Sequence, residues 1–269
     1  MINIDTQNIY YDNGLHSSKG DQLKTCINDI WYKADRLGYE SLSEIIVSKL
    51  LVKTNILSFA DYSFEQMQYQ DRCYNACKSQ GFLSENEKLI TCERLFFLCT
   101  GKSLAEEMAR QSIKDKISLF VSSIEGMTGL AGFGAYLTAL LEIDTLFLNE
   151  DRHTNNIALI RNENTGLYRP APIFDNGAAL FSDTFMDYPL DMSIENCLKK
   201  VTAKPFSTDF DDQLEAAESL FGVSLHCHFS PKDVNEILEP FANIYEERIL
   251  DRVRETLHWQ MRKYQYLFY

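Results

Sequence analysis

The sequence lacks the hydrophobic segments that direct a chain into or across a membrane. It begins with residues 1–5, MINID, which have neither the basic stretch nor the apolar stretch of a secretory signal peptide. No apolar run approaches the roughly twenty residues needed to span a bilayer. The longest candidate, residues 130–148, is interrupted by Glu142 and Asp144. We therefore expect a cytoplasmic protein without stable membrane association.

An excess of positive charge is also absent. Thirty-nine Asp and Glu residues against twenty-six Lys and Arg residues leave a formal net charge of −13. The average field of such a surface repels phosphate backbones and anionic lipid headgroups. For this reason we do not expect the chain to bind nucleic acid directly.

A paired-cysteine framework is missing. The seven cysteines are odd in number and scattered, which is typical of reduced cytosolic thiols. Cys73 and Cys77 lack a second ligand pair at zinc-ribbon spacing, and His226-Cys227-His228 has no partner pair nearby. We interpret both groupings as structural residues and expect no zinc site.

The remaining composition is that of an ordinary globular protein, with 45% hydrophobic and 24% charged residues and no internal repeat or low-complexity linker. A chain of 269 residues can bury a sizeable core and suits one bilobed domain or two small ones.

Residues 1–83 have the pattern of a small β-rich lobe that covers a nucleotide. The expected elements are a hairpin of residues 22–27 and 30–33 around the turn-forming pair Asn28-Asp29, a helix after Gly38 capped by Ser41 or Ser43, and a strand over residues 56–64.

Residues 84–269 are predicted to form a larger, mostly helical lobe. Ser84 and Glu87 fit a capping box that would start its first helix. Residues 130–148 are apolar on most sides and predict a buried central helix. Short strands are expected over residues 157–161 and 167–174, and helices over residues 104–110, 113–124, 194–201, 210–221, 234–238 and from about 241. The predicted class is α+β, a bilobed protein-kinase-like fold.

Two loops carry the candidate chemistry. Asp151 and Asn156 lie five residues apart directly after the central apolar stretch, and Asp175 precedes Asn176 and Gly177 after a short apolar run. Protein kinases place a catalytic Asp, a metal-binding Asn and a second metal-binding Asp in this order. Asp151 would accept the proton of the acceptor hydroxyl, while Asn156 and Asp175 would hold Mg²⁺, which prefers oxygen ligands.

Each loop alone could be a polar turn. Their combination, in this order and with a predicted hairpin between them, favours a kinase that uses ATP and Mg²⁺. We therefore predict Asp151 as the catalytic residue and Asn156 and Asp175 as the metal ligands.

Four stretches resemble the HipA-like serine/threonine kinases, bacterial relatives of the lipid and protein kinase superfamily. They are DRHxxN at residues 151–156, APIFDNGAAL at 171–180, SKGDQLKT at 18–25 and IWYKAD at 30–35. The similarity covers about residues 17–187, over half of the chain. Because the chain begins almost directly at the nucleotide loop, it resembles the short, stand-alone members of the family.

The resemblance implies further site residues. Lys33 would contact the α- and β-phosphates of ATP, a task suited to a compact charge on a flexible stem. A glutamate on the following helix would pair with Lys33, and we prefer Glu44 to Glu40, one turn earlier. Ser17, Ser18 and Gly20 would belong to a loop whose backbone N–H groups cradle phosphates. Members of this family also autophosphorylate a serine of that loop and thereby expel the nucleotide, which points to Ser17 or Ser18.

The chain departs from the family at one position of the catalytic loop. Asn155 stands where the family commonly has a lysine, which leaves open how the γ-phosphate is neutralised. His153 would orient Asp175 or sense the γ-phosphate, and Arg152 would pair with an acid in the segment after Asp175. Packing of the loop explains both residues equally well, so we class them as support residues.

The leading prediction is an ATP- and Mg²⁺-dependent kinase that phosphorylates Ser or Thr of a protein, with a toxin-like role and self-limitation by autophosphorylation as its extensions. One alternative is a phosphoinositide kinase, because lipid kinases also have the sequence Asp-Arg-His-x-x-Asn in this loop. Against it stand the net charge of −13 and the lack of a polybasic or amphipathic anchor. The other alternative is a pseudokinase that binds nucleotide or a partner protein and transfers nothing.

Overall fold

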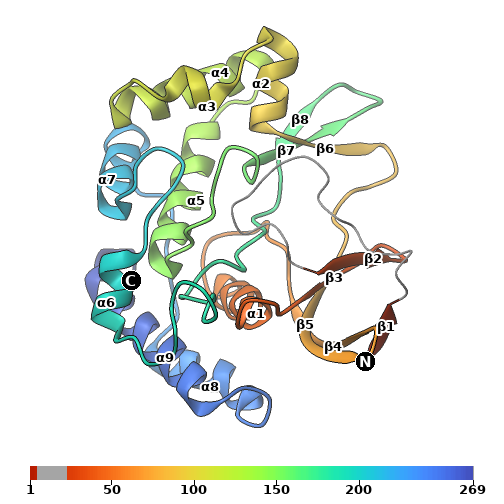
Figure 1. The fold of residues 1–269 in the computed structure, drawn as a ribbon. Coiled ribbons are helices and arrows are strands. Elements are labelled where there is room, and N and C mark those ends of the chain that lie inside the picture. Colours follow the sequence, from red (N-terminus) through yellow and green to blue (C-terminus); the bar gives the residue numbers. More distant parts are fainter. Residues whose placement is uncertain (5–22, 269) are drawn as a thin grey trace.

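The computed structural model describes residues 1–4 and 23–268 of the chain. The protein is α+β, with an amino-terminal β-sheet and a helical carboxyl-terminal part, as predicted (Figure 1). The sheet has five strands in the order β1-β4-β5-β3-β2; β1 is parallel to β4, and the other neighbours are antiparallel. The strands are β1 (Ile2–Ile4), β2 (Lys24–Ile27), β3 (Ile30–Ala34), β4 (Ser63–Tyr69) and β5 (Arg72–Gln80).

The hairpin of β2 and β3 confirms the turn predicted at Asn28-Asp29. Both turn residues have positive φ angles, 52° and 61°. Asn and Asp tolerate this left-handed conformation better than other side chains, and a two-residue turn of this kind matches the twist of the strands. In the resulting register Lys24 lies opposite Lys33.

Helix α1 (Glu40–Leu51) follows Gly38 as expected, but neither Ser41 nor Ser43 caps it. The preceding residue, Tyr39, makes no side-chain capping bond. Instead, the Ser41 N–H donates to the Asp35 carboxylate at 2.6 Å. An acid upstream of the helix therefore satisfies a first-turn donor that we had assigned to a serine.

Two predictions about local structure are wrong. Residues 56–62 are outside the strands, because they pair with a separate segment rather than with the sheet: the Ala60 N–H donates to the Ile173 oxygen, and the Ile173 N–H donates to the Ser58 oxygen. The supposed helix start at Ser84 is instead a turn leading into a strand, β6 (Glu87–Thr91), which pairs with β7. Tertiary pairing thus outweighs the local capping signal.

The helical part is built on a second, three-stranded sheet and a buried helix, α5 (Phe133–Phe147), which confirms the predicted central helix. The other elements are α2 (Cys92–Thr100), α3 (Leu104–Met108), α4 (Ile113–Thr128), β7 (Ala158–Asn162), β8 (Tyr168–Pro170), α6 (Ile194–Lys200), α7 (Phe210–Phe221), α8 (Pro231–Leu238) and α9 (Glu247–Lys263). The last helix begins at Glu247 rather than near residue 241, where a short 3₁₀ turn precedes it.

One hydrophobic core joins α1 to the helical part. Its buried residues include Leu42 and Ile46 from α1 and Leu140 and Leu146 from α5. Helix α1 contacts strands β4 and β5 on one side and α8 on the other, so it lies between the sheet and the helices (Figure 1). Within the described residues no helix is long and apolar enough to cross a membrane.

Candidate active site

Lys33 is the centre of the candidate site. It is the fourth residue of β3, and its ammonium donates to Glu44 on α1 and, at 2.7 Å, to Asp175. Burial by itself would lower the pKa of Lys33, but the carboxylates of Asp175 and Glu44 outweigh it and hold the pKa well above its usual range. Lys33 is therefore a permanent cation between two acids.

Of the two candidate glutamates, Glu44 is the one that contacts Lys33. It is fully buried, and its second oxygen accepts the backbone N–H of Asn176 at 2.9 Å. Burial raises the pKa of Glu44, and Lys33 opposes that effect. Glu40 turns the other way: its carboxylate accepts the backbone N–H groups of Leu37 (2.7 Å) and Gly38 (3.0 Å). Glu40 thus closes the turn before α1.

Asp175 is held in a strained backbone conformation. Its φ angle is 64°, in the left-handed region that non-glycine residues seldom adopt. Such strain costs about 1–3 kcal/mol and persists where the surrounding structure enforces it. Desolvation would raise the pKa of the carboxyl, but Lys33 outweighs this and keeps it well below its usual range. Asp175 is consequently ionised and ready to accept a cation.

Arg152 joins the two candidate loops to each other. Its guanidinium is buried and bonds both oxygens of Asp144 on α5, at 2.8 and 3.0 Å. The same group donates to the backbone oxygens of Phe174 (2.9 Å) and Asn156 (3.3 Å) and to the Asn176 side chain (2.9 Å). The expected acid in the segment after Asp175 is therefore not its partner; the acid comes from the helix before the loop.

This arrangement brings the backbones of the two loops together, because one nitrogen of Arg152 bonds the backbone oxygens of both Asn156 and Phe174. The Asn156 amide nitrogen donates to the backbone oxygen of Asp151 at 2.9 Å, so its amide oxygen is the atom suited to a metal. No group of three His, Cys, Asp or Glu side chains forms a metal cage among the described residues. An amide and a carboxylate, completed by phosphate oxygens and water, fit Mg²⁺.

The Asp151 side chain is partly exposed at the protein surface. The carboxylate is 13% exposed and forms an ion pair with Lys204 at 3.1 Å. Its backbone N–H donates to the Asn149 side chain at 3.3 Å. The preceding loop is fixed in turn, since Asn149 donates to Asp144 at 2.9 Å. The carboxylate thus remains accessible on a rigid base.

His153 makes no hydrogen bond to Asp175 among the described residues. Its Nδ1 accepts the backbone N–H of Asn155 at 3.2 Å, while its Nε2 is buried with no hydrogen-bond partner among them. Burial lowers the pKa of the imidazole despite the nearby carboxylates of Asp151 and Asp175. At neutral pH His153 is accordingly uncharged.

A cavity of about 270 Å³ opens beside Lys33. Its walls are largely apolar and aromatic, which suits a flat ring, with charges at one end. It is lined by Lys24, Asp29, Trp31, Lys33, Tyr62, Ser79, Gln80, Gly81, Phe82, Leu83, Leu89, Phe174 and Asp175. Lys24 was not among our site residues, and its charge contributes to the lowered pKa of Asp175. The predicted hairpin could have identified Lys24 as a site residue, because residues opposite each other on paired strands share one face and Lys24 lies opposite Lys33.

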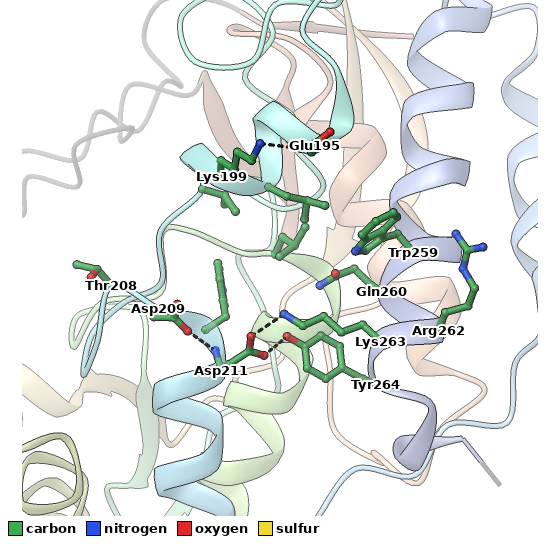
Figure 2. A pocket seen from close by; sticks show the side chains of 14 residues that line it. Glu195, Lys199, Thr208, Asp209, Asp211, Trp259, Gln260, Arg262, Lys263 and Tyr264 are labelled. Carbon is green, nitrogen blue, oxygen red and sulfur yellow. Dashed lines mark hydrogen bonds and ion pairs between the residues drawn. The ribbon is translucent and has the colours of Figure 1, made fainter.

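Two larger cavities, of about 720 and 820 Å³, lie elsewhere along α9. The first is shown in Figure 2, where Lys263 bonds Asp211 and Lys199 bonds Glu195 along its walls. Neither is lined by Lys33, Asp151 or Asp175. The smaller cavity is thus the one that adjoins the candidate chemistry.

Three of the predicted nucleotide-binding residues, Ser17, Ser18 and Gly20, lie outside the described residues. Their phosphate-cradling role and the autophosphorylation of either serine remain predictions.

No protein-family model matches the sequence, and no curated protein matches it. Among solved structures, the chain is similar to the proinflammatory kinase CtkA of Helicobacter pylori, with 16% identity over 97% of this chain and 94% of that chain and a TM-score of 0.63. It also aligns with HipA of Shewanella oneidensis MR-1, solved with HipB and operator DNA, with 12% identity over 96% of this chain and 63% of that chain. The TM-score of 0.49 for HipA is too low to establish a shared fold.

The likeness to CtkA confirms the predicted fold: this chain has a kinase-like α+β architecture. This fold is the one that the resemblance drawn from the sequence implied.

Proposed function

We propose that this chain is a HipA-like protein kinase that transfers the γ-phosphoryl group of ATP to a serine or threonine hydroxyl in the cytoplasm. The observation that carries the proposal is the position of Lys33, ion-paired with both Glu44 and Asp175 at the mouth of an apolar cavity. Protein kinases need this lysine–glutamate pair and a metal-binding Asp in place at the same time. The contacts of Lys33 with Glu44 and Asp175 support this assignment.

In this proposal the cavity holds the adenine ring, and Lys33 and Lys24 face the phosphates. Asn156 and Asp175 hold the Mg²⁺ that accompanies ATP and neutralises its phosphates. Arg152 keeps the loops of both ligands in one arrangement, which lowers the cost of ordering them when substrate binds. The fold supplies positioning and charge, and phosphoryl transfer requires little else from a protein.

Asp151 orients the acceptor hydroxyl and takes its proton. The hydroxyl oxygen then forms a bond to the γ-phosphorus, the bond between that phosphorus and the bridging oxygen of ADP breaks, and ADP leaves with the electron pair. Asp151 later releases the proton to water. Its partial exposure is consistent with an acceptor that approaches from solvent.

Two substitutions test these roles separately. Asp175→Ala is expected to abolish Mg²⁺-dependent binding of the ATP analogue AMP-PNP, measured by calorimetry. Asp151→Asn is expected to keep that binding while transfer of ³²P from ATP to casein falls by a factor of about 10²–10⁴, the range for loss of a general base. Equal AMP-PNP binding by Asp175→Ala would contradict the metal assignment.

The acceptor class is tested by comparing casein with phosphoinositide vesicles. We expect transfer to protein, because a net charge of −13 opposes approach to an anionic membrane. Transfer to vesicles alone would identify a lipid kinase, and AMP-PNP binding without transfer to either acceptor would identify a pseudokinase. Toxin-like action and self-inactivation at Ser17 or Ser18 are part of the proposal only through the family resemblance.

A further inference from the structure

Lys204 is far from the catalytic loop in sequence and adjacent to it in space. It follows α6, 53 residues after Asp151, and its ammonium is 3.1 Å from the Asp151 Oδ1 atom. We infer that Lys204 is the positioning residue for Asp151 during phosphoryl transfer. The inference rests on the proposed function and adds a residue that sequence spacing did not reveal.

The backbone around Lys204 is built to hold it in place. Ala203 is buried, and its N–H donates to the Thr208 oxygen at 2.9 Å, which closes a turn. Phe206 is fully buried and packs edge-on against Phe120 of α4 at 5.4 Å. The buried residues Ala203 and Phe206 therefore hold the backbone on both sides of Lys204, and its side chain extends from there to Asp151.

Lys204 is the ion-pair partner of Asp151, whereas the other cations at the site pair with other acids. The neighbouring cations already have acidic partners: Lys33 pairs with Glu44 and Asp175, and Arg152 pairs with Asp144. Among the described residues, Lys204 is the cation that forms an ion pair with Asp151. Its side chain is 38% exposed and that of Asp151 13%, so an acceptor can reach the pair from solvent.

The pair has a direct use in the proposed reaction. A carboxylate on a loop can rotate, and only some of its orientations receive a proton from the acceptor. Lys204 bonds Oδ1, which leaves Oδ2 as the oxygen that receives the proton of the acceptor. A general base works only when it is within hydrogen-bond reach of its proton, so fixing its rotation raises the rate of the chemical step without changing nucleotide affinity.

The test compares Lys204→Met, which removes the charge and keeps the length, with Lys204→Arg. Lys199→Met is the matched control, because Lys199 is exposed on α6 and pairs with Glu195 away from the cleft. We expect Lys204→Met to lower kcat for ³²P transfer to casein on the order of 10-fold to 100-fold, the usual effect of removing a partner that orients a functional group. AMP-PNP affinity and the unfolding temperature should stay at wild-type values, and Lys204→Arg should recover most of the rate.

A double-variant cycle separates positioning from a purely structural role. If Lys204 acts through Asp151, adding Lys204→Met to Asp151→Asn should lower kcat no further. Additive losses, wild-type kcat in Lys204→Met, equal losses in Lys199→Met, or lost AMP-PNP binding in Lys204→Met would each overturn the inference while leaving the kinase assignment standing. A wild-type protein that binds AMP-PNP but transfers nothing would overturn both.

Discussion

Lys33 stands between two carboxylates that come from different parts of the chain. Glu44 belongs to α1 and Asp175 to the loop after β8, so one ammonium connects the sheet, the helix and the loop. Glu44 and Glu40 are one turn apart and carry the same functional group. Their environments differ: Glu40 accepts backbone N–H groups at the start of the helix, and Glu44 reaches the lysine.

This difference predicts that two matched variants, Glu44→Gln and Glu40→Gln, differ in their affinity for AMP-PNP. Glu44→Gln removes the charge that pairs with Lys33, so we expect AMP-PNP affinity to fall at least about tenfold, in line with the loss of a hydrogen bond between charged groups. Glu40→Gln keeps one of the two acceptor oxygens for the backbone donors and leaves the Lys33–Glu44 pair intact, so it should bind AMP-PNP as the wild type does. Calorimetric titration of both proteins checks this, and a larger loss in Glu40→Gln would contradict the pairing.

At the scale of elements, the β2–β3 hairpin decides which residues of the sheet face the site. Its two-residue turn sets the register that places Lys24 opposite Lys33. A one-residue slip would turn the lysines to the other face of the sheet. The turn residues Asn28 and Asp29 are therefore part of how the cavity obtains its charge.

Substitution at Asn28 tests the turn. Alanine is disfavoured at a φ angle of 52°, whereas glycine adopts that conformation freely. We expect Asn28→Ala to be less stable than Asn28→Gly by about 1–2 kcal/mol. Urea denaturation of the two variants measures the difference, and equal stability would show that the turn adopts another conformation.

Much of the helical part was predictable from the sequence because its signals are local. The helix over residues 210–221 was predicted as it stands in the structure. Residues 87–91 were not, since their strand partner is β7, about 70 residues later, and no local window contains it. The site divides in the same way: Asp151, Asn156 and Asp175 have characteristic spacing, whereas Lys204 reaches Asp151 only through the tertiary fold.

At the scale of the whole molecule, a hydrogen bond to Asp35 connects the amino-terminal sheet region with the carboxyl-terminal helical part. The Tyr245 hydroxyl, 210 residues away, donates to the Asp35 carboxylate at 2.7 Å. Burial, together with the nearby Glu40 carboxylate, raises the pKa of Asp35 to about 7, and the hydrogen bonds from Tyr245 and Ser41 oppose the increase. The folded protein therefore holds a proton that the unfolded chain releases near pH 4.

The consequence is a stability that depends on pH. Between about pH 4 and pH 7 the unfolded chain has lost the Asp35 proton and the folded protein has kept it, so stability should fall as pH rises, by up to about 1.4 kcal/mol per pH unit. Asp35→Asn removes this contribution. The difference in unfolding free energy between wild type and Asp35→Asn, from urea denaturation at pH 5, 6, 7 and 8, should decrease up to about pH 7 and then level off.

Tyr245→Phe provides the control for this prediction. Loss of the hydroxyl removes a donor that favours the ionised carboxylate, so the decrease should continue to higher pH. If the difference in unfolding free energy between wild type and Asp35→Asn is the same at every pH measured, the raised pKa of Asp35 is contradicted.

The contrast between Asp151 and its neighbour Arg152 has a practical use. Arg152 is buried and bonds four residues, Asp144, Asn156, Phe174 and Asn176, whereas the Asp151 side chain is 13% exposed. Under the proposed function, changing Asp151 alone is therefore expected to remove transfer and to leave the fold intact. Loaded with nucleotide, such a protein would serve as bait for trapping the cellular target before it is modified and released.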